Sequence, residues 1–244
     1  MTVSLRVVDL YPSLLQPEGD RGNAVALVHR AEQRGLPAEL VVVHPGDPLP
    51  PADVVCLGGS EDADAAMCAR LLASDGALRS LVEDGTVVLG VGAGFEVLGT
   101  TFVDVAGRVR EGAGLLDAEL STAELASGPV VTAPAAAHGL PAMSGYEHHL
   151  GRARLGPSAV ALAELEIGVG NGDAGLPRRD GAVQGRVVGT WLHGPVLPRN
   201  PALTDLLLGW AAGDRRLGPP PGPEDALADA VREVRIAQAR RPTG

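Results

Sequence analysis

The chain has 244 residues, with 20 Lys and Arg against 30 Asp and Glu, so its formal net charge is −10. This acidic balance argues against a nucleic-acid binder, because contacts to phosphates need a basic surface. Aromatic residues make up only 2% of the chain and every basic residue is Arg, so neither base stacking nor Schiff-base chemistry on a lysine is expected.

Apolar, β-branched runs alternate with helical patterns through the first hundred residues. Strands are expected at residues 5–8, 40–43, 53–57 and 86–89, and helices at 20–35, 62–72 and 95–98. Strands that read as unbroken apolar runs and alternate with helices predict a mostly parallel sheet with helices on both faces.

The pattern changes after about residue 101 to strand-like pieces divided by glycine, which predicts a β-rich second half. These pieces are at residues 130–131, 153–155, 160–165 and 183–191. A helix is expected at 200–210, with Asn200 as its cap and Pro201 in its first turn.

The chain is predicted to divide into a domain at residues 1–217, a Gly/Pro linker at 218–223, and an amphipathic helix with a tail at 224–244. For this last helix, two interpretations stay open. It is either a solvated appendage packed on the domain or a surface that docks a partner.

Two cysteines, Cys56 and Cys68, are too few for a disulfide framework. The first residues lack the basic and apolar regions of a signal peptide, and no apolar run is long enough to cross a bilayer. These features predict a cytoplasmic protein without a membrane span.

The most informative segment is Gly-Val-Gly-Ala-Gly at residues 90–94, between a predicted strand and a predicted helix. Glycines on both sides of a tight turn are typical of the elbow that exposes a nucleophile above a parallel sheet. The central residue is Gly92, which has no side chain. A dinucleotide-binding fingerprint is not formed either, because Phe95 stands where the third glycine is needed.

Two other loops follow predicted strands. Backbone amides of the Gly58-Gly59 loop are candidates to line an oxyanion site, and His193 in a Leu-His-Gly-Pro segment is the natural general base. Ser60 is a weaker candidate nucleophile, because its loop lacks the second elbow glycine.

Adjacent histidines at His148 and His149 invite a metal-site interpretation. Neighbouring residues on a strand point to opposite faces, so both are not expected to bind one ion. We expect one packed and one exposed imidazole, and no metal site.

Together with Gly-Asp-Arg-Gly-Asn at 19–23, Gly-Tyr-Glu-His-His at 145–149 and Asn-Pro at 200–201, the order and spacing of these motifs resemble a known family. The chain is similar to the class I glutamine amidotransferases of the cobyric acid synthase type. Among these it is most similar to the glutaminase (GatD) subunits of lipid II isoglutaminyl synthase. The resemblance covers about residues 5–212 and implies a flavodoxin-like α/β fold.

The resemblance also implies roles for individual residues. His193 matches the family's base, and Gly59 and Ala93 match the backbone donors to the oxyanion. Gly92 stands where the family has its nucleophilic Cys.

The predicted substrate pocket differs from the family's pattern at two further positions. Glu61 and Glu96 stand where the family has Gln, and the predicted pocket also includes Gly58 and Ser60. Two carboxylates in a pocket built for an amide indicate that its small-molecule ligand has changed.

Two functions therefore compete. In the first, the chain is an amidotransferase-like subunit without glutaminase chemistry, a pseudoenzyme in peptidoglycan amidation. It needs no cofactor of its own and acts with a Mur-ligase-like partner that uses ATP, or as a homo-oligomer. In the second, the pocket serves a different reaction or ligand sensing in a biosynthetic pathway, with His193, Glu96 and Glu61 as acid/base groups. An engineered Cys-to-Gly exchange is a third interpretation, against which the two Glu replacements argue.

Overall fold

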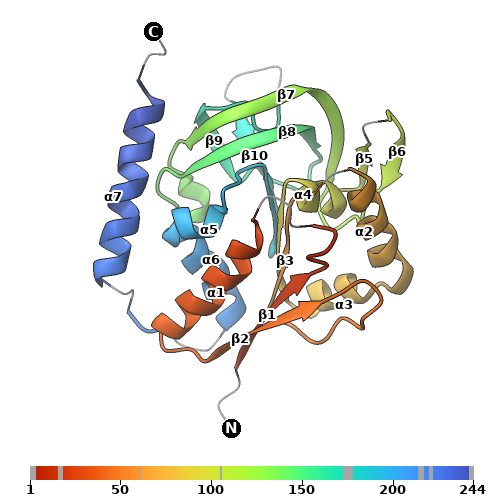
Figure 1. Cartoon of the computed structure of the whole chain (residues 1–244), viewed down its shortest axis with the longest axis horizontal. Coiled ribbons are helices and arrows are strands. Elements are labelled where there is room, and N and C mark those ends of the chain that lie inside the picture. The colour runs from red at the N-terminus through yellow and green to blue at the C-terminus, as the bar shows by residue number, and fades with distance from the viewer. Residues whose placement is uncertain are drawn as a thin grey trace.

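The computed structural model of the chain describes residues 4–15, 19–60, 62–104, 106–172, 178–213, 217–219 and 222–241. Within these residues the strands form two six-stranded sheets. The first is the central sheet of an α/β layer, and the second is a β-rich layer built from the middle of the chain (Figure 1).

The central sheet has the order β11-β12-β4-β3-β1-β2. Its strands are β1 (Leu5–Leu10), β2 (Ala38–Val43), β3 (Val54–Leu57), β4 (Val87–Val91), β11 (Ala182–Gln184) and β12 (Val187–Thr190). All neighbours are parallel except β11, which is antiparallel to β12. The predicted parallel sheet is thus confirmed, and the apolar runs of β3 and β4 are buried along their whole length.

Helices cover both faces of this sheet. One face carries α1 (Arg21–Gln33), α5 (Val196–Arg199) and α6 (Pro201–Ala212), and the other carries α2 (Asp62–Asp75), α3 (Ala77–Glu83) and α4 (Ala93–Leu98). Side chains of β1 alternate between the two cores. Val7 packs in the cluster with α1 and α6, whereas Val8 packs in the cluster with α2 and α4.

The second sheet contains the long hairpin of β7 (Ala118–Thr132) and β8 (Ser144–Leu155), with a short 3-10 turn at Ala136–His138 between them. It is completed by β5 (Thr101–Val103), β6 (Val109–Glu111), β9 (Ala163–Ile167) and β10 (Arg179–Asp180). An antiparallel bridge between Tyr146 of β8 and His193 joins this sheet to the carboxyl end of β12. The second sheet therefore lies at the carboxyl end of the parallel strands, next to the loops that follow those strands.

The structure differs from the sequence analysis in three local details. Residues 183–191 form a hairpin rather than one strand, because Gly185 adopts a positive φ of 60° and turns the chain between β11 and β12. Asn200 is the N-cap residue of α6, as expected, and its carbonyl accepts the amides of Leu203 and Thr204; its side chain, however, makes no capping hydrogen bond and instead bonds the backbone of Ser144 and Val196. The short helices α3 and α5 were not expected.

The last helix, α7 (Gly222–Ala239), begins inside the predicted linker and packs beside α1, α5 and α6 (Figure 1). Arg30 of α1 forms ion pairs with Asp205 of α6 and Asp225 of α7. At the other end of the helix, Arg240 pairs with Glu166 of β9. This packing agrees with the appendage interpretation, while the division into domain, linker and helix stays a prediction.

Among the described helices, none has both the length and the apolar character that crossing a bilayer requires.

The buried guanidinium of Arg30 generates a stability prediction. Its side chain is 8% exposed, and removing it leaves Asp225 without its cation, while Asp205 keeps its ion pair with Arg34. We expect Arg30→Ala to lower the free energy of unfolding by about 2–3 kcal/mol, because breaking a largely buried ion pair leaves unpaired charge. Urea denaturation measures the loss. The matched control Arg6→Ala removes a surface pair with Glu39 and should cost about 1 kcal/mol or less; equal losses would contradict the prediction.

Candidate active site

Gly92 joins β4 to α4 in a conformation that favours glycine, with φ 56° and ψ −116°. Its carbonyl accepts the amides of Phe95 and Glu96, which starts the helix immediately after the turn. A Cβ built at Gly92 would lie 2.6 Å from Cε1 and 2.9 Å from Nε2 of His193. The strand–turn–helix elbow is thus present, and a side chain at its apex would point directly at the imidazole.

His193 follows β12 and is 5% exposed. Its Nδ1 lies 3.3 Å from Oδ2 of Asp20, a fully buried side chain at the start of α1. A carboxylate at this nitrogen favours a proton on Nδ1, so Nε2 is left facing Gly92 as the basic nitrogen. The pair therefore has the arrangement of a general base with its orienting group.

The two expected oxyanion donors differ in their surroundings. The amide of Gly59 donates to Oδ2 of Asp20 at 2.8 Å, so in this structure it serves the carboxylate. Ala93 is the first residue of α4, and its amide has no acceptor within the helix. Gly58 contacts the elbow directly, because its carbonyl accepts a hydrogen bond from the amide of Gly94 at 3.0 Å.

A cavity of about 330 Å³ opens over the elbow between the two sheets. It is lined by Gly59, Ser60, Gly92, Ala93, Glu96, Thr122, Leu125, His148, His149, Leu150, Trp191 and His193. Six of the residues expected from the sequence therefore meet at one cavity. Gly58 is not part of the lining, and Glu61 lies outside the described residues.

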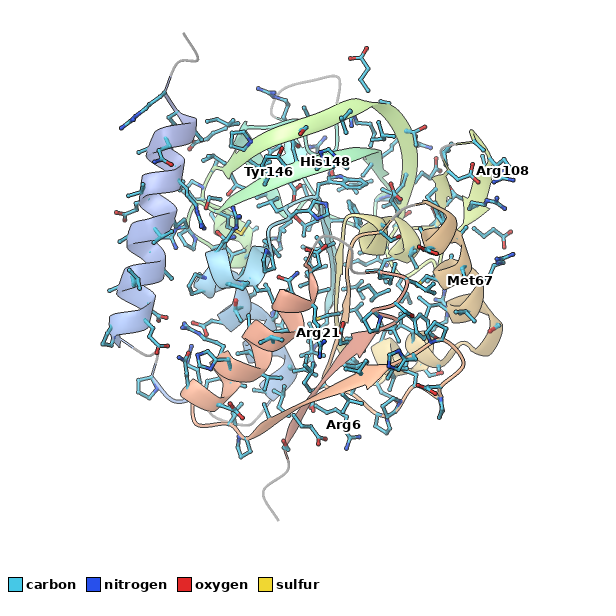
Figure 2. The ribbon with its side chains drawn as sticks, viewed as in Figure 1. Arg6, Arg21, Met67, Arg108, Tyr146 and His148 are labelled. Carbon is cyan, nitrogen blue, oxygen red and sulfur yellow. The ribbon has the colours of Figure 1, made fainter. Side chains whose placement is uncertain are left out.

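His148 and His149 follow the expected pattern of one exposed and one buried imidazole. His149 stacks on Trp191 with ring centroids 4.3 Å apart, and its Nε2 is 3.4 Å from Oε2 of Glu147. His148 and Tyr146 lie along the same strand (Figure 2), and both side chains contact the hydroxyl of Ser127. Sequence reasoning missed that both histidines border the cavity.

The carboxylate of Glu147 is a buried anchor for the second sheet. It accepts hydrogen bonds from the amides of Val169 and Gly170 at 2.8 and 2.9 Å. Burial raises the pKa of Glu147, but the hydrogen bonds from His149, Gly170 and Val169 outweigh it, so the net pKa is below the ordinary value. This glutamate holds the strand that carries His149.

Asp180 is a second buried carboxyl near the base. It accepts the Thr190 hydroxyl at 2.5 Å and the Trp191 amide at 3.2 Å. Burial, together with the charge of Glu147, raises the pKa of Asp180 to about 7, although both hydrogen bonds and the charge of His193 oppose the shift. Asp180 thus fixes the end of β12 just before His193.

Neither cysteine of the chain lines the cavity over the elbow. Cys56 lies in β3 and Cys68 in α2, and both are buried. Burial raises the pKa of Cys68 to about 12 and that of Cys56 further still, so neither side chain supplies a thiolate near neutral pH. Ser60 borders the cavity. No group of three potential metal ligands occurs among the residues that the structure describes.

Asp20, Trp191 and Asp180 are the site residues that sequence reasoning missed. Asp20 lies in the quoted Gly-Asp-Arg-Gly-Asn motif, directly before the first helix. A signal existed, because parallel strands place the loops that follow them at one edge of the sheet. An acidic residue in the loop after β1 was therefore a candidate neighbour of His193.

The model of the CobB/CobQ-like glutamine amidotransferase domain family matches residues 27–201. Over 230 residues the chain is 30% identical to the GatD subunit of lipid II isoglutaminyl synthase (glutamine-hydrolyzing) from Staphylococcus aureus strain N315, covering 91% of this chain and 90% of that protein. The GatD subunit from Streptococcus pneumoniae strain ATCC BAA-255 / R6 is 26% identical, with 80% and 76% covered. Cobyric acid synthase from Brucella abortus strain S19 is 38% identical over 163 residues, 64% of this chain but 32% of that protein.

Solved structures agree on the fold. A crystal structure of a glutamine amidotransferase superposes with a TM-score of 0.57 at 19% identity, covering 84% of this chain and 98% of the other. PurLQS from Thermotoga maritima gives a TM-score of 0.59 at 15% identity, with 85% and 99% covered. These likenesses establish the class I glutamine amidotransferase fold.

Asp180 generates a pH prediction. Its folded-state pKa of about 7 is above the ordinary value of 3.8, so the folded protein holds a proton that the unfolded chain releases. Its contribution to stability is therefore present below about pH 4 and is lost as the pH rises toward 7. We expect Asp180→Asn to become more stable relative to the unmodified protein across this range, measured by urea denaturation at each pH. The exposed control Asp84→Asn should give no such trend, and parallel profiles for Asp180→Asn would contradict the assignment.

Proposed function

Because the chain belongs to the CobB/CobQ-like glutamine amidotransferase family, we propose that it is a GatD-like subunit that does not itself hydrolyse glutamine. The observation that carries this proposal is the vacant apex of the elbow at Gly92, which faces His193. The family resemblance implies a Cys at this position. In this proposal the chain retains the fold of the family but does not carry out the covalent step of glutamine hydrolysis.

Glutamine hydrolysis through a thioester needs a thiolate that attacks the side-chain amide carbon and expels ammonia. Gly92 has no atom that can form this bond, so the covalent step is absent rather than slowed. The base His193 and its orienting partner Asp20 are both in place. A base of this kind activates a nucleophile, and by itself it does not replace the missing sulfur.

The names of the relatives, which are subunits of a synthase, support the proposal of a partner. We infer a Mur-ligase-like partner that activates a carboxylate with ATP and accepts ammonia from another source. In that assembly this chain serves as a scaffold in a cell-wall amidation complex. It has no Gly-x-x-x-x-Gly-Lys loop, so ATP binding is assigned to the partner.

A second candidate function is binding or conversion of a ligand other than glutamine. The observation that favours it is the set of polar side chains around His193: Glu96, His148 and His149 line the same cavity. A carboxyl and several imidazoles form acid/base and hydrogen-bonding groups suited to a polar ligand. Glu61 belongs to this hypothesis by its sequence position.

The proposed function predicts that the purified chain releases no ammonia from glutamine, because the elbow has no nucleophile. A coupled glutamate dehydrogenase assay measures the release. Ser60→Ala, prepared in parallel, tests the remaining hydroxyl at the cavity. Ammonia release that co-purifies with the protein would contradict the prediction, and its loss in Ser60→Ala would assign the nucleophile to Ser60.

The geometry of the elbow also predicts that Gly92→Cys creates a reactive thiol. The new Cβ requires the His193 ring to move slightly, after which sulfur and imidazole are neighbours, and a nearby imidazole favours the thiolate. We expect alkylation by iodoacetamide at neutral pH to be at least about tenfold faster than in the unmodified protein, where Cys56 and Cys68 are buried. Adding His193→Asn should remove most of the gain.

The same variant separates the two candidate functions. Gly92→Cys combined with Glu61→Gln and Glu96→Gln should hydrolyse glutamine if the pocket is a decayed amidotransferase site. A triple variant that alkylates rapidly but leaves glutamine intact would favour a site rebuilt for another ligand. Slow alkylation of Gly92→Cys would contradict the active geometry assigned to the elbow and His193.

A further inference from the structure

A second cavity of about 360 Å³ lies where the end of α7 meets β7, β8 and α5. Its polar lining consists of Ser144, Tyr146, Arg199, Arg235 and Gln238, and the remaining lining residues are apolar or glycine. It shares no lining residue with the cavity over the elbow. No acidic side chain contributes to this lining, although the chain as a whole carries an excess of acidic residues.

Two guanidinium groups line this second cavity, which is an open groove. Arg199 of α5 and Arg235 of α7 are both half-buried. Burial and the positive charge of Arg235 lower the pKa of Arg199, which places the two cations within electrostatic reach of each other. Among the described residues neither makes an ion pair, whereas Arg30 and Arg240 on the same side of the molecule do.

Ser144 provides an independent sign of a missing ligand. It is 2% exposed, and its hydroxyl has no hydrogen-bond partner within the part of the chain that the structure describes. Ser144 and Tyr146 are two residues apart on β8, so their side chains leave the same face of the strand. A buried hydroxyl without a partner is costly, and an oxygen atom of a bound ligand would remove that cost.

We propose that this groove binds a phosphate-bearing anion between Arg199 and Arg235, with Ser144 and Gln238 as further hydrogen-bond donors. Guanidinium groups match phosphate oxygens with paired hydrogen bonds, and two adjacent cations call for a ligand with at least two negative charges. The volume of about 360 Å³ is large enough for a diphosphate. This site is separate from the proposed function and does not depend on it.

The groove touches the segment that carries the base. Nε of Arg199 donates to the carbonyl of Gly194 at 2.7 Å, and the backbone of Tyr146 pairs with that of His193. An anion that engages Arg199 would therefore bind a side chain that itself contacts the loop after His193. The proposed anion site is thus linked to the loop of His193 through Arg199 and Tyr146.

The experiment is a calorimetric titration of the full chain with inorganic pyrophosphate in chloride buffer at constant ionic strength. The unmodified protein should show saturable binding at one site. Arg235→Gln should weaken it by about tenfold or more, since hydrogen bonds to charged groups are strong. Arg235 is the primary choice because Arg199 also supports the Gly194 carbonyl.

The control Arg70→Gln removes the same charge from α2, on the opposite side of the molecule from α7 (Figure 1), and should bind like the unmodified protein. Ser144→Ala should weaken binding by a smaller factor, and thermal unfolding without ligand checks that each variant is folded. Phosphate alone should bind more weakly than pyrophosphate. No saturable binding, equal affinity of Arg235→Gln, an equal loss in Arg70→Gln, or tighter binding of malonate than of pyrophosphate would each overturn the proposal.

Discussion

The carboxylate of Asp20 is the contact on which the geometry of the active site depends. One of its oxygens accepts the Gly59 amide and faces Nδ1 of His193, so it joins the loops that follow β1, β3 and β12. Burying a charge is costly unless it is compensated, and these two contacts provide compensation. The same oxygen thereby sets the position of the loop beside the elbow and the orientation of the base.

A second set of buried polar groups supports the base from the other sheet. Asp180 binds Thr190 and Trp191, the Trp191 ring stacks on His149, and His149 contacts Glu147. These contacts connect β10, β12 with the residue that follows it, and β8. The apex of the elbow is Gly92, which has no side chain, yet a supporting network of buried side chains surrounds it.

Local sequence signals predicted the parallel sheet, the elbow and His193, because each depends on a run of neighbouring residues. They did not predict Asp20 as the partner of His193, or Asp180 as the carboxyl that binds Thr190 and Trp191. Asp180 lies ten residues before Thr190 on another strand, and only the antiparallel return through β11 brings the two together. Asn200 shows the same limit. Its position before Pro201 is typical of a cap, but Ser144 of β8 competes successfully for its side chain.

The pairing of Arg30 also has a consequence for the order in which the protein acquires its structure. Its two partners are 175 and 195 residues further along the chain. During synthesis, α1 leaves the ribosome long before α6 and α7 exist, so its guanidinium stays hydrated while the parallel sheet is still incomplete. Contacts of such long sequence separation close late in folding. Completion of α7 is thus a natural last step, and a nascent chain that stops short of it retains an open edge along α1.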